Sequence, residues 1–311
     1  MNRLVAPCSK AAFADWWKTT AGDRFAKIPA GVLDHRRFWD AMHAVALEDL
    51  GEISRRIAVR IVGASGVDCS SVALDMTNFA GFIDTGNQKA PIAQRGKAKQ
   101  KRTDLRLVGL GLVVTRDGGI PLTWHAYPGD RPDVTQFPAM IDQLLRQYQA
   151  VTAAAGVPAG DPEMTVVFDA GQNSEANFAH LAGTGLHYIG SVPASDCPDL
   201  TALPASARSV VDEDRFGGLT GYDTRREVYG TGRRAILTHS PQLHESQAAG
   251  FDGTTLAKAG RKLDELAAAL EEEIFGKHVL ITDHDDWPAA EVIAGYRSQS
   301  EAEFSFRQLK D

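Results

Sequence analysis

Ser71-Val-Ala-Leu-Asp75-Met-Thr-Asn-Phe79 is a short apolar run that leads into an acid followed by Thr and Asn. The segment Met164-Thr-Val-Val-Phe168-Asp169-Ala-Gly171 repeats this arrangement later in the chain. Each run predicts a buried strand that breaks into a turn at its acid. Open α/β sheets bind ligands at the carboxyl ends of their central strands. The two runs therefore predict an α/β fold with Asp75 and Asp169 at one edge, although a turn-forming Asp is the plainer interpretation of either acid alone.

The carboxyl-terminal segment predicts a helix that carries a third acid. Tyr296, Glu303 and Lys310 are spaced seven residues apart, so they share one helix face with a drift of roughly 20° per heptad. Arg307 joins this face four residues after Glu303. Glu301 is the alternative acid, but it lies roughly 200° around the helix from Glu303, so only one of the two can face a site. An ordinary amphipathic surface helix is the competing interpretation. Three apolar residues are expected to dock the helix: Phe304, Phe306 and Leu309.

This spacing resembles the Tyr…Glu…Lys signature of DDE transposases encoded by bacterial insertion sequences. In that family a Tyr precedes the third catalytic acid by seven residues and a Lys follows it by seven, as Tyr296 and Lys310 do around Glu303. Gln299 stands where the family often has Arg, which weakens the expected DNA contact. The resemblance runs from residue 35 to residue 311. Between and after the first two acids, these segments resemble strands and loops of the family: 101–105, 107–114, 127–135 and 280–283.

The resemblance implies a ribonuclease H-like mixed sheet flanked by helices, with Asp75, Asp169 and Glu303 as catalytic residues and metal ligands. Cutting and rejoining a phosphodiester requires an activated oxygen nucleophile and a stabilised leaving oxyanion, which two divalent ions can supply together. Oxygen ligands favour Mg²⁺, with Mn²⁺ as a substitute. Asp75 is the candidate to bridge both ions. The implied partners are the terminal inverted repeats and the target DNA, both double-stranded, and the active form is expected to be a homodimer.

Three parts of the chain are expected. Residues 1–66 form a helical amino-terminal region, 67–192 with 279–311 form the catalytic core, and 193–278 form an insertion with a hairpin around Gly230-Thr-Gly232. The core strands are predicted near 71–75, 106–116, 120–127, 164–169 and 186–192. Helices are predicted near 133–154, 174–182 and, in the insertion, 255–274. Four basic residues of the insertion either bind DNA or form cross-strand ion pairs, and ion pairing is the favoured interpretation. They are Arg225, Arg226, Arg233 and Arg234.

The net charge of −7 over 311 residues is unexpected for a DNA-binding protein. Because neutralised phosphates drive non-specific DNA binding, the cations have to be concentrated locally. One concentration lies in a stretch expected to be a loop, which is either solvated or a phosphate contact. The predicted DNA-binding residues are those of this loop and of the terminal helix: Lys97, Lys99, Lys101, Arg102, Tyr296, Arg307 and Lys310.

Cysteine usage and hydropathy predict a cytoplasmic protein, and the DNA partner that the resemblance implies makes it nucleoid-associated. Three widely spaced Cys residues form no metal-binding pattern and favour a reducing compartment. The longest apolar run, 107–114, is too short to span a bilayer, and the amino terminus lacks a leader-like apolar segment.

Two alternatives to a transposase remain open from the sequence. The first alternative is an inactive truncated relic or a DNA-associated scaffold. It is suggested because the chain stops one residue after Lys310, whereas relatives continue with helices that cover the sheet. A metal-dependent nuclease that hydrolyses without joining is the other. Residues 283–287, Asp-His-Asp-Asp-Trp, are a rival metal site, but neighbouring residues on an extended loop point in different directions. A turn that opens a helix at Pro288 is the favoured interpretation.

Overall fold

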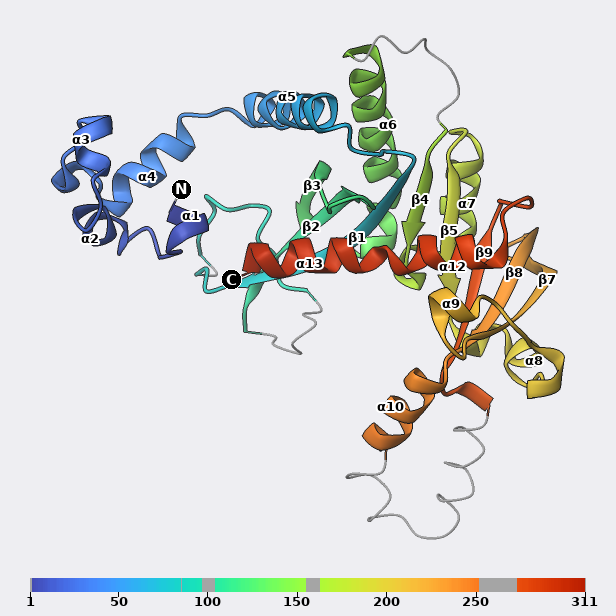
Figure 1. Cartoon of the computed structure of the whole chain (residues 1–311). Coiled ribbons are helices and arrows are strands. Elements are labelled where there is room, and N and C mark those ends of the chain that lie inside the picture. Colours follow the sequence, from blue (N-terminus) through green and yellow to red (C-terminus); the bar gives the residue numbers. More distant parts are fainter. Residues whose placement is uncertain (1, 85, 97–103, 155–162, 252–272, 311) are drawn as a thin grey trace. The chain divides into compact units, whose positions relative to one another are not determined.

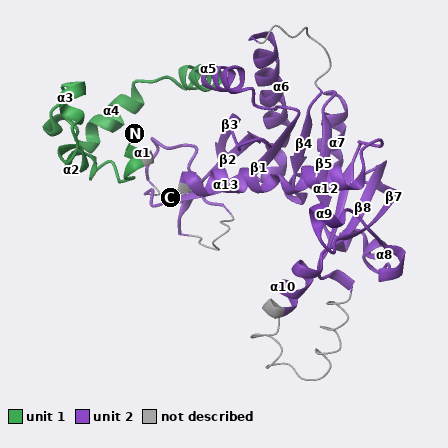
Figure 2. Ribbon diagram, viewed as in Figure 1, with its two compact units in different colours: residues 1–56 green, residues 57–311 purple. Residues whose placement is uncertain are grey.

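The computed structural model describes residues 2–84, 86–96, 104–154, 163–251 and 273–310. The chain forms two compact units, Met1–Arg56 and Ile57–Asp311, which Figure 2 shows in different colours. Among the described residues, no helix combines the length and the apolar character that crossing a membrane requires.

The first unit is helical. Its rings gather around Phe13, whose centroid lies 5.2 Å from that of Trp16 and 5.0 Å from that of Phe38. The long helix α5 begins in this unit and ends in the second. The helices are α1 (Asn2–Val5), α2 (Phe13–Lys18), α3 (Gly22–Ala26), η1 (Ala30–Val32), α4 (His35–His43) and α5 (Leu47–Ser65).

The second unit is built on one mixed sheet, in which the described strands lie in the order β3-β2-β1-β4-β5-β9-β8-β7-β6 (Figure 1). β1, β2 and β3 form an antiparallel meander, and β4 and β5 continue the sheet parallel to β1. This is the ribonuclease H-like arrangement that the sequence predicted. The five strands are β1 (Ser71–Gly81), β2 (Arg106–Thr115), β3 (Pro121–Pro128), β4 (Thr165–Phe168) and β5 (His187–Val192).

The segment after β5 extends the same sheet. β9 pairs antiparallel with β5, and β8 and β7 follow as a hairpin. The hairpin turns at Tyr229 and Gly230, whose φ values of 49° and 73° lie in the left-handed region. The predicted hairpin is therefore confirmed, and it belongs to the sheet. The strands are β6 (Ser209–Val210), β7 (Thr220–Val228), β8 (Thr231–His239) and β9 (Lys277–Thr282), with α8 (Pro198–Thr201), α9 (Glu213–Phe216) and α10 (Pro241–Phe251) between them.

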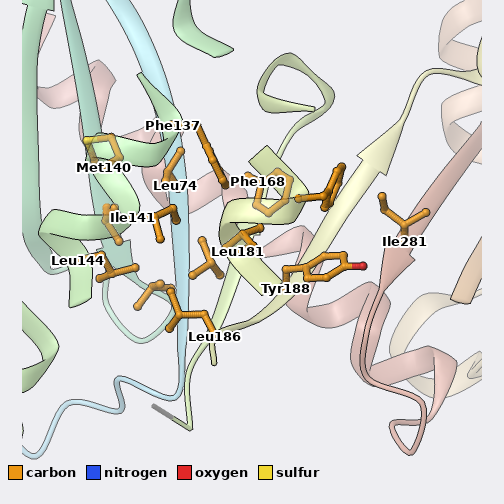
Figure 3. Close-up of a cluster of buried hydrophobic side chains, with 14 of the residues drawn as sticks. Leu74, Phe137, Met140, Ile141, Leu144, Phe168, Leu181, Leu186, Tyr188 and Ile281 are labelled. Carbon is orange, nitrogen blue, oxygen red and sulfur yellow. The ribbon is translucent and has the colours of Figure 1, made fainter. Parts of the chain in front are cut away.

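The largest hydrophobic cluster lies on the sheet face that α6 (Phe137–Ala154) and α7 (Glu175–Ala182) cover (Figure 3). Phe168 of β4 is at its centre, 5.0 Å from Phe137 of α6 and 6.0 Å from Phe178 of α7 between ring centroids. Fully burying a large apolar side chain contributes roughly 1.5 to 3 kcal/mol, so this face supplies much of the stability of the unit.

The opposite face is covered by α12 (Ala289–Arg297) and α13 (Gln299–Lys310), which are red in Figure 1. Val292 and Ile293 of α12 pack with Val167 of β4. Ala302 and Phe306 of α13 pack with side chains of β1 and β2. The two terminal helices are thereby held against the strands that carry the first two predicted acids.

Two predicted elements differ from the structure or lie outside it. The strand expected at 71–75 continues to Gly81, because β2 pairs with it from Val72 to Gly81. Asp75 therefore lies inside a strand and not at a turn, so the predicted break after this acid is wrong. The helix expected at 255–274 falls almost entirely outside the described residues.

Candidate active site

Asp75 and Asp169 are neighbours across two parallel strands. The pairing of β1 with β4 ends with Ala73 opposite Val167, and each Asp is two residues further along the direction of its own strand. Adjacent strands lie about 4.8 Å apart. The two Asp residues, far apart in the sequence, therefore occupy adjacent positions, one on β1 and the other directly after β4.

Both acids belong to the sheet face under the terminal helices. Ala73 packs against α13 and Val167 packs against α12. Because side chains alternate along a strand, Asp75 and Asp169 share the face of these two residues. Both side chains are half-buried, as expected at the rim of a covered face.

Glu303 lies on α13 directly after the buried Ala302, and its side chain is exposed. Glu301, the alternative acid, points to a different place. Its Oε2 atom lies 3.1 Å from the position that a Cβ on Gly119 would occupy, in the turn between β2 and β3. The two glutamates therefore diverge, and Glu301 is directed at a turn.

The charges of two predicted site residues affect Tyr296 of α12. Burial raises the pKa of the Tyr296 phenol, a hydrogen bond with Ser191 lowers it, and the negative charges of Asp169 and Glu303 raise it further. One hydroxyl therefore lies within electrostatic reach of two of the three acids. α12, which carries Tyr296, packs on β4, the strand that leads into Asp169, and α13, which carries Glu303, packs on β1.

Asp75 has its own neighbours. Its Oδ1 atom accepts a hydrogen bond from the backbone N–H of Met76 at 2.7 Å. The hydroxyl of the buried Tyr127 donates a hydrogen bond to Asp133 Oδ1 at 2.6 Å. Burial is the largest cause of the raised pKa of Tyr127. The hydrogen bond and charge of Asp133 raise this pKa further, and the charge of Asp75 adds a smaller effect. Asp133 is therefore held by Tyr127, whose phenol the charge of Asp75 also affects, and the sequence analysis did not identify Asp133 as a site residue.

Asp169 is held by the turn that follows it. Its Oδ1 atom accepts from the backbone N–H of Gly171 at 2.8 Å. Gln172 is buried, and its amide donates to Asp169 in the orientation that satisfies both groups. Asn173 donates to the Ser191 carbonyl at 2.7 Å. The sequence analysis missed these positioning residues, and the only available signal was their place directly after the acid.

The terminal segment is two helices, so the prediction of one continuous helix is wrong. α12 ends at Arg297 and α13 begins at Gln299. Ser298 separates them because its N–H and its hydroxyl both donate to the Gly295 carbonyl, at 3.0 and 2.6 Å, instead of continuing the helical ladder. Tyr296 therefore belongs to another helix than Glu303, yet it stays within reach of that acid.

The docking residues of α13 also differ in part from prediction. Phe306 is buried as expected, with 4% exposure, and Ala302 joins it. Phe304 and Leu309 are 53% and 54% exposed, so their predicted docking role is wrong. α13 is rotated about its axis so that Ala302 and Phe306, four residues apart, face the sheet.

The predicted DNA-binding cations are described only in part. Arg307 is exposed on α13, and Lys310 ends that helix. The loop residues Lys97, Lys99, Lys101 and Arg102 lie outside the described residues. In the hairpin, cross-strand ion pairing is confirmed for Arg234, which lies 2.5 Å from Asp223. Arg225 and Arg226 form ion pairs outside the hairpin, with Asp285 at 2.7 Å and with Asp199 of α8. Arg233 lies over the Phe178 ring and donates to the Tyr188 hydroxyl at 2.6 Å.

The segment before α12 forms the predicted turn and helix entry. α12 begins at Ala289, directly after Pro288, and Asp285 pairs with Arg225. Arg234 also donates to the carbonyls of His284 and Trp287 at 2.7 and 2.6 Å. These contacts position the turn that leads into the helix carrying Tyr296.

The donor chemistry of Asp75, Asp169 and Glu303 fits a hard divalent cation. All three offer carboxylate oxygens, and none offers sulfur or imidazole nitrogen. Such a set suits Mg²⁺ or Mn²⁺ and not a thiolate-seeking metal.

Comparison with known proteins identifies the class. The family model described as "Transposase DDE domain" matches residues 72–311. The chain therefore belongs to the family of transposases with a DDE domain, as the resemblance predicted, and transposases of this family generally use divalent metal ions. The narrower assignment to the bacterial subgroup with the Tyr…Glu…Lys signature stays a prediction. The search of curated proteins returned no match.

Two solved structures are similar to this chain. A piggyBac transposase synaptic complex with hairpin DNA has 8% sequence identity and a TM-score of 0.41, covering 78% of this chain and 40% of that one. A Mos1 transposase paired-end complex with left transposon end has 10% identity and a TM-score of 0.25, covering 58% of this chain and 59% of that one. The chain thus spans less than two thirds of the length of either.

Proposed function

We propose that this protein is a DNA transposase in which Asp75, Asp169 and Glu303 form the catalytic carboxylate set. It would cleave the ends of an insertion sequence and join them to target DNA in the cytoplasm, at the nucleoid. The observation that supports the proposal is the packing of three distant segments: β1 and β4 pair in parallel, and Ala302, next to Glu303, packs with Ala73, two residues before Asp75.

The three acids would hold two Mg²⁺ ions, which Mn²⁺ can replace. When bound, such a pair stabilises both the attacking and the leaving oxygen of an in-line displacement. Asp75 belongs to a strand paired on both sides, with β2 and β4, and is the proposed bridging ligand. Asp169 is oriented by Gly171 and Gln172, so its carboxylate is preorganised before any ligand arrives.

The remaining groups would position DNA. Tyr296 is half-buried, so its phenol can orient a phosphate or an acid without large motion. Arg307 is exposed four residues after Glu303, and cations there lower the cost of bringing a polyanion against carboxylates. Lys310 and the loop cations at positions 97, 99, 101 and 102 are proposed phosphate contacts of the same kind.

The organisation of the chain remains part of this proposal. Residues 193–278 would act as the insertion between the second and third acids, and residues 1–66 as a helical region outside the core. The active form would be a homodimer bound to double-stranded terminal repeats. Light scattering with and without end DNA tests this, with a dimer expected in the bound state.

The function is tested with labelled fragments of the DNA that flanks the coding sequence, mixed with protein, Mg²⁺ and unlabelled target DNA. We expect cleavage at a defined end and a longer joined product. Asp75→Asn should abolish both. Asp214→Asn, which changes an exposed acid of α9, is the matched control and should retain both.

The products also distinguish the alternatives. Cleavage without a joined product, dependent on the same acids, would identify a nuclease. Binding without cleavage by the unmodified protein would identify a relic or scaffold and refute the catalytic proposal.

A further inference from the structure

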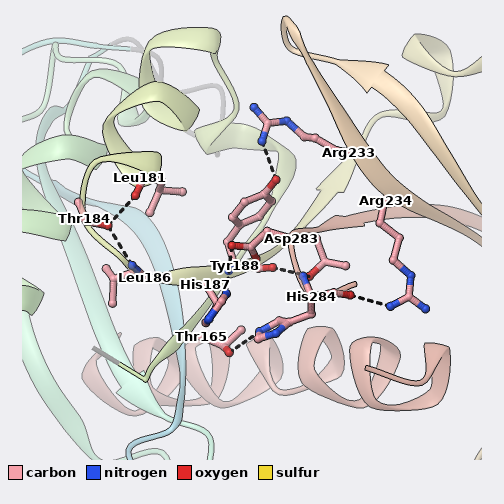
Figure 4. A network of polar contacts seen from close by, with 11 residues as sticks. Thr165, Leu181, Thr184, Leu186, His187, Tyr188, Arg233, Arg234, Asp283 and His284 are labelled. Atoms are coloured by element: carbon pink, nitrogen blue, oxygen red, sulfur yellow. Dashed lines mark hydrogen bonds and ion pairs between the residues drawn. The ribbon is translucent and has the colours of Figure 1, made fainter. Parts of the chain in front are cut away.

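A second group of metal-ligating side chains lies away from the three acids. We name it the His–Asp–His cluster: His187, Asp283 and His284. His187 is the first residue of β5, and Asp283 and His284 directly follow β9. Because these strands are antiparallel, with Ile189 opposite Thr282, the start of one meets the end of the other. Figure 4 shows the cluster and its hydrogen bonds.

The cluster and the proposed catalytic acids lie at opposite ends of β4. His187 is paired with Thr165, the first residue of β4, whereas Asp169 follows the last. Four residue steps along a strand span about 13 Å. An ion bound by the cluster is therefore not one that the proposed catalytic acids hold.

The three side chains can offer ligand atoms to a common point. One ligand atom from each lies within 4.8 Å of those of the other two. His187 Nδ1 lies 3.2 Å from Asp283 Oδ2, and the two imidazole centroids are 4.4 Å apart. Ligands around a tetrahedral zinc ion with bonds near 2.1 Å are about 3.4 Å apart. A small inward shift of side chains would complete the set.

The surrounding residues orient the ligands as outer partners of a metal site do. Thr165 Oγ1 lies 2.8 Å from His284 Nε2, which leaves Nδ1 of that ring for a ligand bond. The His284 ring stacks on Trp287 with centroids 3.8 Å apart and planes 12° apart. Asp283 Oδ1 accepts from the Tyr188 N–H at 2.9 Å. Metal-binding imidazoles ordinarily give their second nitrogen to an oxygen in this way.

The donor set selects a different metal from the carboxylate set. Two imidazoles and one carboxylate suit zinc or a similar transition metal, with water in the fourth position, whereas Mg²⁺ prefers oxygen ligands alone. We propose that His187, Asp283 and His284 form a zinc site that ties the start of β5 to the end of β9. The ion would brace the turn through which the chain enters α12. This proposal is independent of the catalytic one.

The test uses the full chain carrying Asp75→Asn, Asp169→Asn and Glu303→Gln, so that the carboxylate set does not compete. This parent is titrated with Co²⁺, whose visible absorption reports tetrahedral coordination, and then with Zn²⁺. We expect one Co²⁺ ion per chain, displaced by Zn²⁺ and unaffected by excess Mg²⁺. Zn²⁺ should also raise the melting temperature of the parent.

Two further variants remove ligands one at a time. His187→Gln and Asp283→Asn should each weaken Co²⁺ binding by at least about tenfold and remove the thermal effect of Zn²⁺. His180→Gln is the matched control, because His180 forms a similar pair with Asp142 at 2.9 Å on α7 and α6. It should bind Co²⁺ as the parent does. A parent that binds no Co²⁺, or either ligand variant binding it unchanged, would show that the cluster is only a hydrogen-bonded group.

Discussion

Tyr296 is a residue on which the charges of two of the proposed catalytic acids act. Its phenol forms a hydrogen bond with Ser191 on β5, and the negative charges of Asp169 and Glu303 raise its pKa. Asp169 is in turn held by the Gly171 N–H and the Gln172 amide. The neighbours of each acid therefore influence its orientation and charge, and single-residue substitutions can test the role of each acid separately.

Glu303→Gln should abolish DNA cleavage and leave the fold intact, because an exposed carboxylate contributes its charge to metal binding and little to packing. Glu301→Gln is the internal control. Glu301 faces the Gly119 turn, so cleavage should persist. The rates are compared on the same end DNA, with circular dichroism to verify folding. Equal activity of both variants would exclude Glu303 as the third acid.

Lys310→Ala should weaken DNA binding across all sequences and flatten its salt dependence by about one unit of slope, as for one lost phosphate contact. Arg307→Ala should act similarly, since Arg307 is exposed on the same helix as Glu303. Fluorescence anisotropy at several salt concentrations measures both quantities. Gln308→Ala, an exposed neutral neighbour, should change neither. Unaltered slopes in the two cationic variants would make α13 an ordinary surface helix.

At the scale of elements, α13 positions its acid by burying two side chains. Ala302 and Phe306 pack with Ala73, Leu112 and Val114. Ala73 is two residues from Asp75, and Ala302 is adjacent to Glu303. The packing that docks the helix therefore also sets the approach of the third acid to the first.

Phe306→Ala should lower the free energy of unfolding by about 3 to 5 kcal/mol, because it removes a buried ring and leaves a cavity under the helix. Phe304→Ala should have a much smaller effect, since that ring is 53% exposed. Urea denaturation of both variants provides the comparison. Similar losses at the two positions would mean that α13 does not dock through the face described.

Across the whole molecule, the proposed site is assembled from segments that are distant in sequence and carry like charge. The chain has 40 acidic and 33 basic residues, so it offers little general attraction for DNA. The three carboxylates of the proposed site would repel a polyanion and one another. Bound divalent cations would offset both repulsions.

Activity should consequently depend on the identity of the cation. Mg²⁺ or Mn²⁺ should support strand cleavage, whereas Ca²⁺ should support DNA binding alone, because its looser coordination does not organise in-line attack. Removal of divalent ions with a chelator should stop cleavage, and added Mg²⁺ should restore it. Full cleavage in the presence of chelator would contradict the carboxylate site.

Local pattern was enough to predict several elements. β-Branched and aromatic residues before Asp169 specify β4, and the Gly-containing turn between β7 and β8 specifies the hairpin, because strand and turn preferences depend on near neighbours. The Tyr296 to Lys310 spacing, together with the two strand-end acids and the segments between them, was sufficient to predict the family through its resemblance. The alternation of strands and helices was also sufficient to predict the α/β class.

Other features depended on partners distant in the sequence. Pairing with β2 carries β1 past Asp75, and the two hydrogen bonds from Ser298 to Gly295 end α12 before Glu303. His187 and Asp283 adjoin only because the chain folds back. The sequence by itself thus determined which segments form strands, which acids to examine and the family. Only the tertiary structure decided where strands end and which side chains meet, because cross-strand pairing and packing join residues that no local pattern relates.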